Sequence, residues 1–265
     1  MPRGTGIPAL PLPGLLALLA CAVVAWYFTV VTAAGMPAGP GPMGMGLFGY
    51  LAGWELMMTA MMLPALAPLL GVYLRSLRAV RNNGVRTART VALVAGYLLT
   101  WALFGILAYG LAVLGGLLAL QAPVAAPWVG AALLAAAGIY QLTPLKNFCL
   151  RHCRSPVAFL LHVSGYKGPL RDLRTGIYHG MYCTGCCWGL MLVLVVVGVM
   201  NLAWMAVIAA VILLEKTWRH GVVFSRLVGI CLIAFAVVAP AFPALLPGLD
   251  VVPGMDQGMD PGMEM

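Results

Sequence analysis

Residues 91–119 read VALVAGYLLTWALFGILAYGLAVLGGLLA and contain no Asp, Glu, Lys or Arg. An apolar stretch of this length can cross the roughly 30 Å hydrocarbon core of a bilayer as an α-helix. Similar stretches recur along the 265-residue chain, of which 63% is hydrophobic and 8% is charged. Soluble domains are about 45–50% apolar and about 25% charged. The composition therefore excludes a soluble globular protein and predicts a polytopic membrane protein.

Seven apolar stretches predict an all-α integral membrane bundle of about seven transmembrane helices. The sixth is short, and only Met200 and Asn201 separate it from the fifth, so a tight helical hairpin or a re-entrant pair is expected there. The first is expected to be retained as a helix and not removed as a signal peptide. The stretches are residues 15–34, 50–73, 91–119, 126–143, 177–199, 202–217 and 222–246.

Lys and Arg residues gather in the segments that follow the second, fourth and sixth stretches. Cytoplasmic loops of membrane proteins are enriched in these residues. With the N-terminus inside, every Lys and Arg falls on the cytoplasmic side, which predicts a multi-pass protein of a bacterial-type inner (cytoplasmic) membrane. The net charge of +8 then reflects orientation, and no nucleic-acid partner is expected.

The same orientation places the C-terminal tail outside the membrane. We expect residues 1–247 to form the transmembrane helical domain. Residues 248–265 are rich in Met, Asp, Gly and Pro, a composition too polar to pack into a core. They are therefore expected to form a disordered outer tail.

Two short clusters of Cys and His provide the first set of candidate metal ligands. Within each cluster the spacing puts the side chains on one face of a helix, and both clusters are expected at the inner membrane surface. Reduced thiols there favour metal binding or redox exchange over structural disulfides, with simple packing as the alternative role. A contact between Cys153 and the second cluster would show that the two form one site. The clusters are Cys149, His152 and Cys153, and His179, Cys183, Cys186 and Cys187.

Glu55 and a stripe of methionines form the second candidate metal site. An ionisable residue within a predicted span indicates function. Met58, Met61 and Met62 share one helix face, and soft thioethers select Cu(I) over magnesium or calcium. Packing between helices is the alternative role of Met. Because further Met residues occur in the outer segments, the pattern favours a soft ion that approaches from outside.

Two other features predict contacts between helices. Regularly spaced glycines between Gly176 and Gly189 indicate close helix packing. The adjacent residues Glu215 and Lys216 are expected to form an interfacial ion pair, with proton coupling as the alternative role.

Three motifs resemble a known family. They are WELMMTAMMLP at residues 54–64, YQLTPLK at 140–146 with CLRHCRSP at 149–156, and HGMYCTGCCW at 179–188. Over about residues 50–220 the chain resembles a family of predicted metal-binding integral membrane proteins of unknown function, sometimes labelled copper chaperone. The resemblance implies metal binding by all seven residues of the two Cys and His clusters.

The leading functional hypothesis is a membrane protein that handles Cu(I). Thioethers bind this ion weakly and thiolates bind it tightly, so outer methionines would collect it and inner cysteines would receive or hold it. Zinc is the less favoured metal. The expected partners are the lipid bilayer and a protein that donates or accepts metal.

Several alternatives stay open at this stage. Cys183, Cys186 and Cys187 could act as a thiol–disulfide redox relay, or His152 and His179 could hold haem or a quinone. The chain could also be a structural subunit of a respiratory or oxygenase complex. No catalytic residues are predicted, and the sequence contains no ATP-binding loop that ends in Gly-Lys-Ser or Gly-Lys-Thr.

Overall fold

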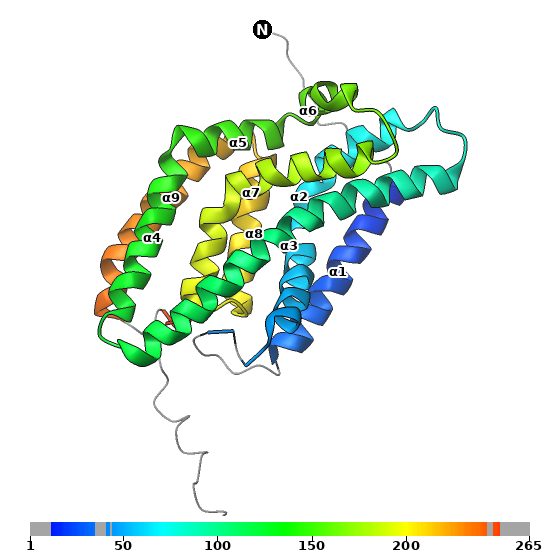
Figure 1. Ribbon diagram of the computed structural model, residues 1–265. Helices are drawn as coiled ribbons and strands as arrows, with labels where there is room; N and C mark the ends of the chain where they lie inside the picture. Colours follow the sequence, from blue (N-terminus) through cyan, green and yellow to red (C-terminus); the bar gives the residue numbers. More distant parts are fainter. Residues whose placement is uncertain (1–11, 35–40, 43, 243–245, 250–265) are drawn as a thin grey trace, which may run out of the picture.

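The computed structural model describes residues 12–34, 41–42, 44–242 and 246–249. Within these residues every regular element is a helix (Figure 1), which confirms the predicted all-α class. In chain order the helices are α1 (Leu12–Ala34), α2 (Leu47–Ser76), α3 (Asn83–Gln121), α4 (Ala126–Leu142), α5 (Pro144–Arg154), α6 (Pro156–His162), η1 (Val163–Gly165), α7 (Arg171–Val197), α8 (Leu202–Thr217), α9 (Gly221–Val238) and η2 (Ala239–Ala241).

Five helical segments of the described chain are long and apolar enough to cross a membrane: α1, α2, α3, α7, and α9 with η2. α4 and α5 qualify as a sixth span when taken together, although they are bent by 62°. α8 matches the predicted sixth stretch but has 16 residues. That length is about 24 Å of helix at 1.5 Å per residue, which is less than the roughly 30 Å hydrocarbon core. The count of seven spans is therefore not confirmed, and the orientation stays a prediction.

The bend between α4 and α5 occurs at Thr143 and Pro144. A residue before proline is disfavoured in the α region, and Thr143 has extended backbone angles. Its hydroxyl accepts a hydrogen bond from the Lys146 backbone N–H at 3.3 Å, which caps the start of α5. α5 then packs against α7, and this packing positions the first cysteine cluster.

α7 packs against α3, α4, α5 and α8, and Figure 1 shows it in the middle of the bundle. Glycines allow α3 and α7 to cross closely. A Cβ at Gly176 would overlap the carbonyl oxygen of Leu93, and a Cβ at Gly96 would overlap that of Leu173. Close packing at the spaced glycines of α7 is therefore confirmed.

α7 begins at Arg171, before the predicted stretch that starts at residue 177. Polar residues extend the helix at this end, although they interrupt the apolar pattern. The second cysteine cluster therefore lies well inside the helix and is buried.

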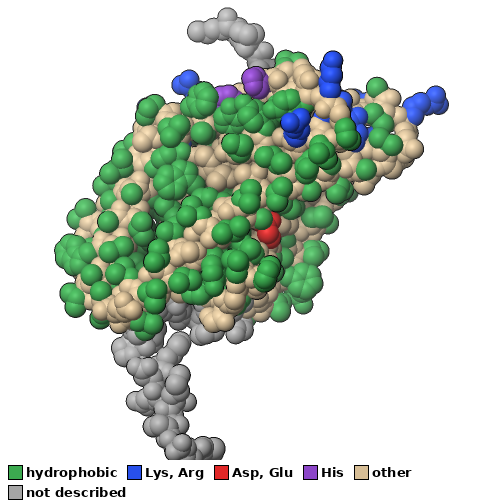
Figure 2. Space-filling model, in the orientation of Figure 1, with side chains coloured by type: hydrophobic (Ala, Val, Ile, Leu, Met, Phe, Trp, Pro, Cys, Tyr) green, Lys and Arg blue, Asp and Glu red, His purple; other side chains and the backbone are tan. Residues whose placement is uncertain are grey.

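Lys and Arg side chains gather at one end of the face shown in Figure 2. Figure 1 places the turn between α2 and α3 and the segment around α6 at that end. This distribution agrees with the clustering of Lys and Arg in the sequence. Most of the Met-rich and acidic tail, from residue 250 on, lies outside the described residues.

Candidate metal centre

The two cysteine clusters meet where α5 packs against α7. Cys153 Sγ on α5 lies 3.8 Å from Cys186 Sγ on α7, and both side chains are buried. The contact expected of a shared site is therefore present, between residues that are 33 positions apart in the chain.

Arg154 anchors the end of α5 that carries Cys153. Its guanidinium donates hydrogen bonds to the carbonyl oxygens of Glu215 and Arg219, at 3.0 and 3.2 Å. Those carbonyls belong to the end of α8 and to the turn before α9. α5 is thus fixed to α8 as well as to α7, next to the cysteine that contacts Cys186.

Gly185 makes room for α5 to approach α7. A Cβ at Gly185 would lie only 2.9 Å from Cys149 Sγ. The Tyr140 hydroxyl donates a hydrogen bond to the Gly185 carbonyl oxygen, and the Tyr140 ring packs against Trp188 with 4.8 Å between ring centroids. α4, α5 and α7 are therefore held together at the glycine that faces Cys149.

Cys183 has two polar partners from other helices. The Lys216 ammonium on α8 lies 2.9 Å from Cys183 Sγ, and the Tyr97 hydroxyl on α3 lies 3.0 Å from the same sulfur. All three side chains are buried. This contact brings a cation to the cysteines, although neither partner was a candidate site residue in the sequence.

Lys216 does not pair with Glu215, so that sequence-based expectation was wrong. Glu215 instead accepts from the Lys146 ammonium at 2.8 Å and from the Gln141 side-chain amide at 3.3 Å. Adjacent helical residues point about 100° apart, because a turn takes 3.6 residues. Glu215 therefore faces α4 and α5, whereas Lys216 faces α7. Glu215 and Lys216 are recognisable in the sequence as charged side chains in an apolar helix. Their partners can be identified only in the tertiary structure.

Cys186 and Cys187 contact their own helix as well. Their Sγ atoms lie 3.1 and 2.8 Å from the Cys183 carbonyl oxygen, and both side chains are buried. Cys183, Cys186 and Cys187 thus occupy about one turn of α7 beside Cys153. We refer to these four residues as the thiol cluster.

The two histidines of the predicted clusters have aromatic neighbours. His179 is buried, with its ring centroid 6.0 Å from that of Tyr97 and 5.0 Å from that of Phe159. His152 is half-buried and stacks on Tyr182 at 4.3 Å.

In the described part of the chain, no three Cys, His, Asp or Glu side chains are arranged to hold a metal ion. The contact between Cys153 and Cys186 is present, and the ligand roles of both histidines stay predictions.

The second predicted metal site lies on α2. Met58, Met61 and Met62 are buried in the hydrophobic core, which is compatible with packing and with thioether coordination. Glu55 is half-buried, and its Oε1 is buried without a hydrogen-bond partner among the described residues. The ligand roles of these four residues stay predictions.

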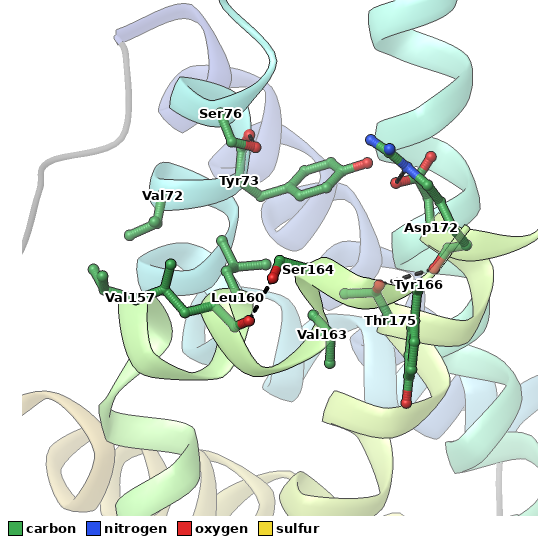
Figure 3. Close-up of a pocket in the computed structure, with 12 residues that line it drawn as sticks. Val72, Tyr73, Ser76, Val157, Leu160, Val163, Ser164, Tyr166, Asp172 and Thr175 are labelled. Carbon is green, nitrogen blue, oxygen red and sulfur yellow. Dashed lines mark hydrogen bonds and ion pairs between the residues drawn. The ribbon is translucent and has the colours of Figure 1, made fainter. Parts of the chain in front are cut away.

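A cavity of about 410 Å³ lies between the end of α2, the segment from α6 to Tyr166, and the start of α7 (Figure 3). Its charged side chains pair within the protein, since Asp172 accepts from Arg89 at 2.9 Å and from Arg171 at 3.3 Å. The hydroxyl of Thr175 donates to the Arg171 carbonyl oxygen. The cavity contributes none of the cysteines and is not assigned to the metal centre.

The chain matches the family model PpoB2, described as copper chaperone, over residues 51–239. No curated protein and no solved structure matches it. The family match includes the thiol cluster, the three methionines on α2 and Lys216. Because it covers more than half of the chain, this protein belongs to the copper chaperone family.

Proposed function

We propose that this protein binds Cu(I) at the thiol cluster, with Cys153 and Cys186 as the first two ligands, and passes the ion to a protein partner at a bacterial inner membrane. The observation that carries this proposal is the 3.8 Å contact between the two sulfurs, which joins the two sequence clusters. The family supports copper as the cargo.

A buried pair of sulfurs has the chemistry that suits Cu(I). Soft thiolate ligands select this ion, and Cu(I) accepts as few as two of them. Structural zinc sites, in contrast, take four ligands in a tetrahedral arrangement. A contact between two sulfurs therefore suits Cu(I) better than zinc.

Neighbouring sulfurs would provide a route for ligand exchange. Cys183 and Cys187 lie within about one turn of Cys186 on α7, so the ion can change partners while it stays bound to sulfur. Met58, Met61 and Met62 on α2 would supply weaker thioether ligands for the incoming ion. Transfer from thioethers to thiolates would then be favourable because thiolates bind Cu(I) more tightly.

A thiol–disulfide relay is the second candidate, and the same sulfur contact favours it. If Cys153 and Cys186 formed a disulfide, the two thiols would lose two protons and two electrons in total. A disulfide in a partner protein would accept both and be reduced to two thiols. This candidate requires reversible oxidation in the cell, whereas Cu(I) binding requires both cysteines to stay reduced.

Competition with a chromophoric Cu(I) chelator, under anaerobic and reducing conditions, tests the proposal on the detergent-purified full-length protein. We expect Cys153→Ser and Cys186→Ser each to weaken Cu(I) binding by about a hundredfold or more, since loss of an outer-shell partner alone costs about 10–100-fold. Cys231→Ser is the matched control, because this cysteine is exposed on α9, and it should leave the affinity unchanged.

Two results would contradict the proposal. One is wild-type Cu(I) affinity in Cys153→Ser, and the other is no Cu(I) binding by the reduced wild-type protein. A stable disulfide between Cys153 and Cys186, found by alkylation and peptide mapping of protein taken directly from cells, would instead support the redox relay.

A further inference from the structure

A buried lysine, Lys216, contacts the thiol cluster. Lys216 Nζ lies 2.9 Å from Cys183 Sγ, on the turn of α7 that also carries Cys186. Among the described residues, no Asp or Glu forms an ion pair with Lys216, because Glu215 is paired with Lys146. Of the described side chains, the one that the structure places in hydrogen-bond contact with this ammonium is the Cys183 thiol.

We propose that Lys216 makes the thiol cluster selective for soft monovalent ions, Cu(I) and Ag(I), over divalent ions such as Zn(II) and Cd(II). This inference rests on the proposed function and adds a residue that determines specificity. Lys216 would act through its fixed positive charge and not as a metal ligand, because an ammonium has no lone pair to offer.

A count of charges shows the preference. Two thiolates and one monovalent ion carry a net charge of −1, which the ammonium of Lys216 neutralises. Two thiolates and one divalent ion are already neutral, so the ammonium would leave a net charge of +1. An uncompensated charge is costly in a buried site of low dielectric constant. A divalent ion would therefore need a third thiolate to reach neutrality.

A third thiolate can be recruited only at the cost of existing contacts. Cys183 is engaged by Lys216 and Tyr97, and the Cys187 thiol contacts the Cys183 carbonyl oxygen. A divalent ion would have to break these contacts to recruit either sulfur. A monovalent ion needs only the pair formed by Cys153 and Cys186.

The test compares the affinities for Ag(I) and Cd(II) of the reduced full-length protein in detergent. Ag(I) is a redox-inert substitute for Cu(I), and Cd(II) bound to thiolates is detected by its ultraviolet absorbance. Two variants, Lys216→Gln and Lys216→Met, remove the charge, and Lys216→Arg keeps it. The double variant Lys146→Met with Glu215→Gln is the matched control, because it removes another buried lysine together with its partner.

We expect the ratio of Ag(I) affinity to Cd(II) affinity to fall by about tenfold or more in the two neutral variants. The ratio should stay near the wild-type value in Lys216→Arg and in the control. An unchanged ratio in a neutral variant that elutes as a monodisperse, folded protein overturns the role of Lys216. A wild-type protein that binds Cd(II) as tightly as Ag(I) overturns it as well.

The test separates this inference from the proposed function. If the wild-type protein binds no Ag(I), or if Cys153→Ser binds it with wild-type affinity, the proposed metal centre itself is wrong. If Ag(I) binding depends on Cys153 and the ratio does not respond to the charge at position 216, only the selectivity role is wrong.

Discussion

At the scale of single residues, the buried ionisable side chains of α8 each have a partner on a different helix. Lys216 contacts Cys183 on α7, and Glu215 pairs with Lys146 on α5. A buried ion pair adds little net stability over apolar residues of similar size. The loss of one partner is nevertheless costly, because the other charge is left uncompensated.

Lys146→Met is therefore expected to lower the free energy of unfolding by about 3–5 kcal/mol, since it leaves the Glu215 carboxylate without its cation. Adding Glu215→Gln to this variant should recover most of the lost free energy of unfolding. Thermal unfolding in detergent, followed by tryptophan fluorescence, measures both effects. Equal destabilisation by the single and the double variant would show that the two residues do not act as a pair.

At the scale of secondary structure elements, glycines decide how closely α7 approaches its neighbours. Gly176 meets the backbone of α3, and Gly185 faces Cys149 on α5. These contacts set the position of the thiol cluster, because three of its four cysteines lie on α7 between and beside the two glycines.

Gly176→Ala should separate α3 from α7, because the new methyl group would overlap the Leu93 carbonyl oxygen. We expect a loss of about 1–3 kcal/mol in unfolding free energy, as for other overpacked sites. Gly110→Ala on α3 is the control, since a Cβ there meets nothing within 4 Å. The same thermal unfolding assay applies, and equal stability of the two variants would contradict the close crossing.

At the scale of the whole molecule, the number of spans and the side of the membrane on which the C-terminus lies depend on whether α8 crosses the membrane. With the N-terminus inside and seven crossings, the C-terminus lies outside. If α8 does not cross and the other six segments do, the C-terminus lies inside. The side on which the C-terminus lies therefore tests whether α8, which is shorter than the hydrocarbon core, crosses the membrane.

A topology reporter fused after Met265 is expected to be active only on the outer side. A reporter inserted in the turn at residues 77–82 is expected to be active only on the inner side, because that region is rich in arginine. Enzyme reporters that work on one side of a bacterial inner membrane provide the measurement. If both reporters were active only inside, the count of seven spans would be wrong.

The sequence by itself determined the helical class, the presence of several apolar stretches long enough to span a membrane, and the spacing of the candidate ligands within each cysteine cluster. These properties are local, because apolar stretches and i, i+3, i+4 spacing depend only on neighbouring residues. The extent of α7 was less predictable, since its first turns are polar and break the apolar pattern.

Only the tertiary structure decided which side chains meet. The contact between Cys153 and Cys186 and the contact between Cys183 and Lys216 each join residues 33 positions apart, and the pair of Lys146 and Glu215 spans 69 positions. Such contacts depend on the bend after α4 and on the glycine-mediated packing of α7. In the sequence, Glu215 and Lys216 are neighbours and were expected to pair. In the folded protein their side chains point about 100° apart on α8, so they contact different helices.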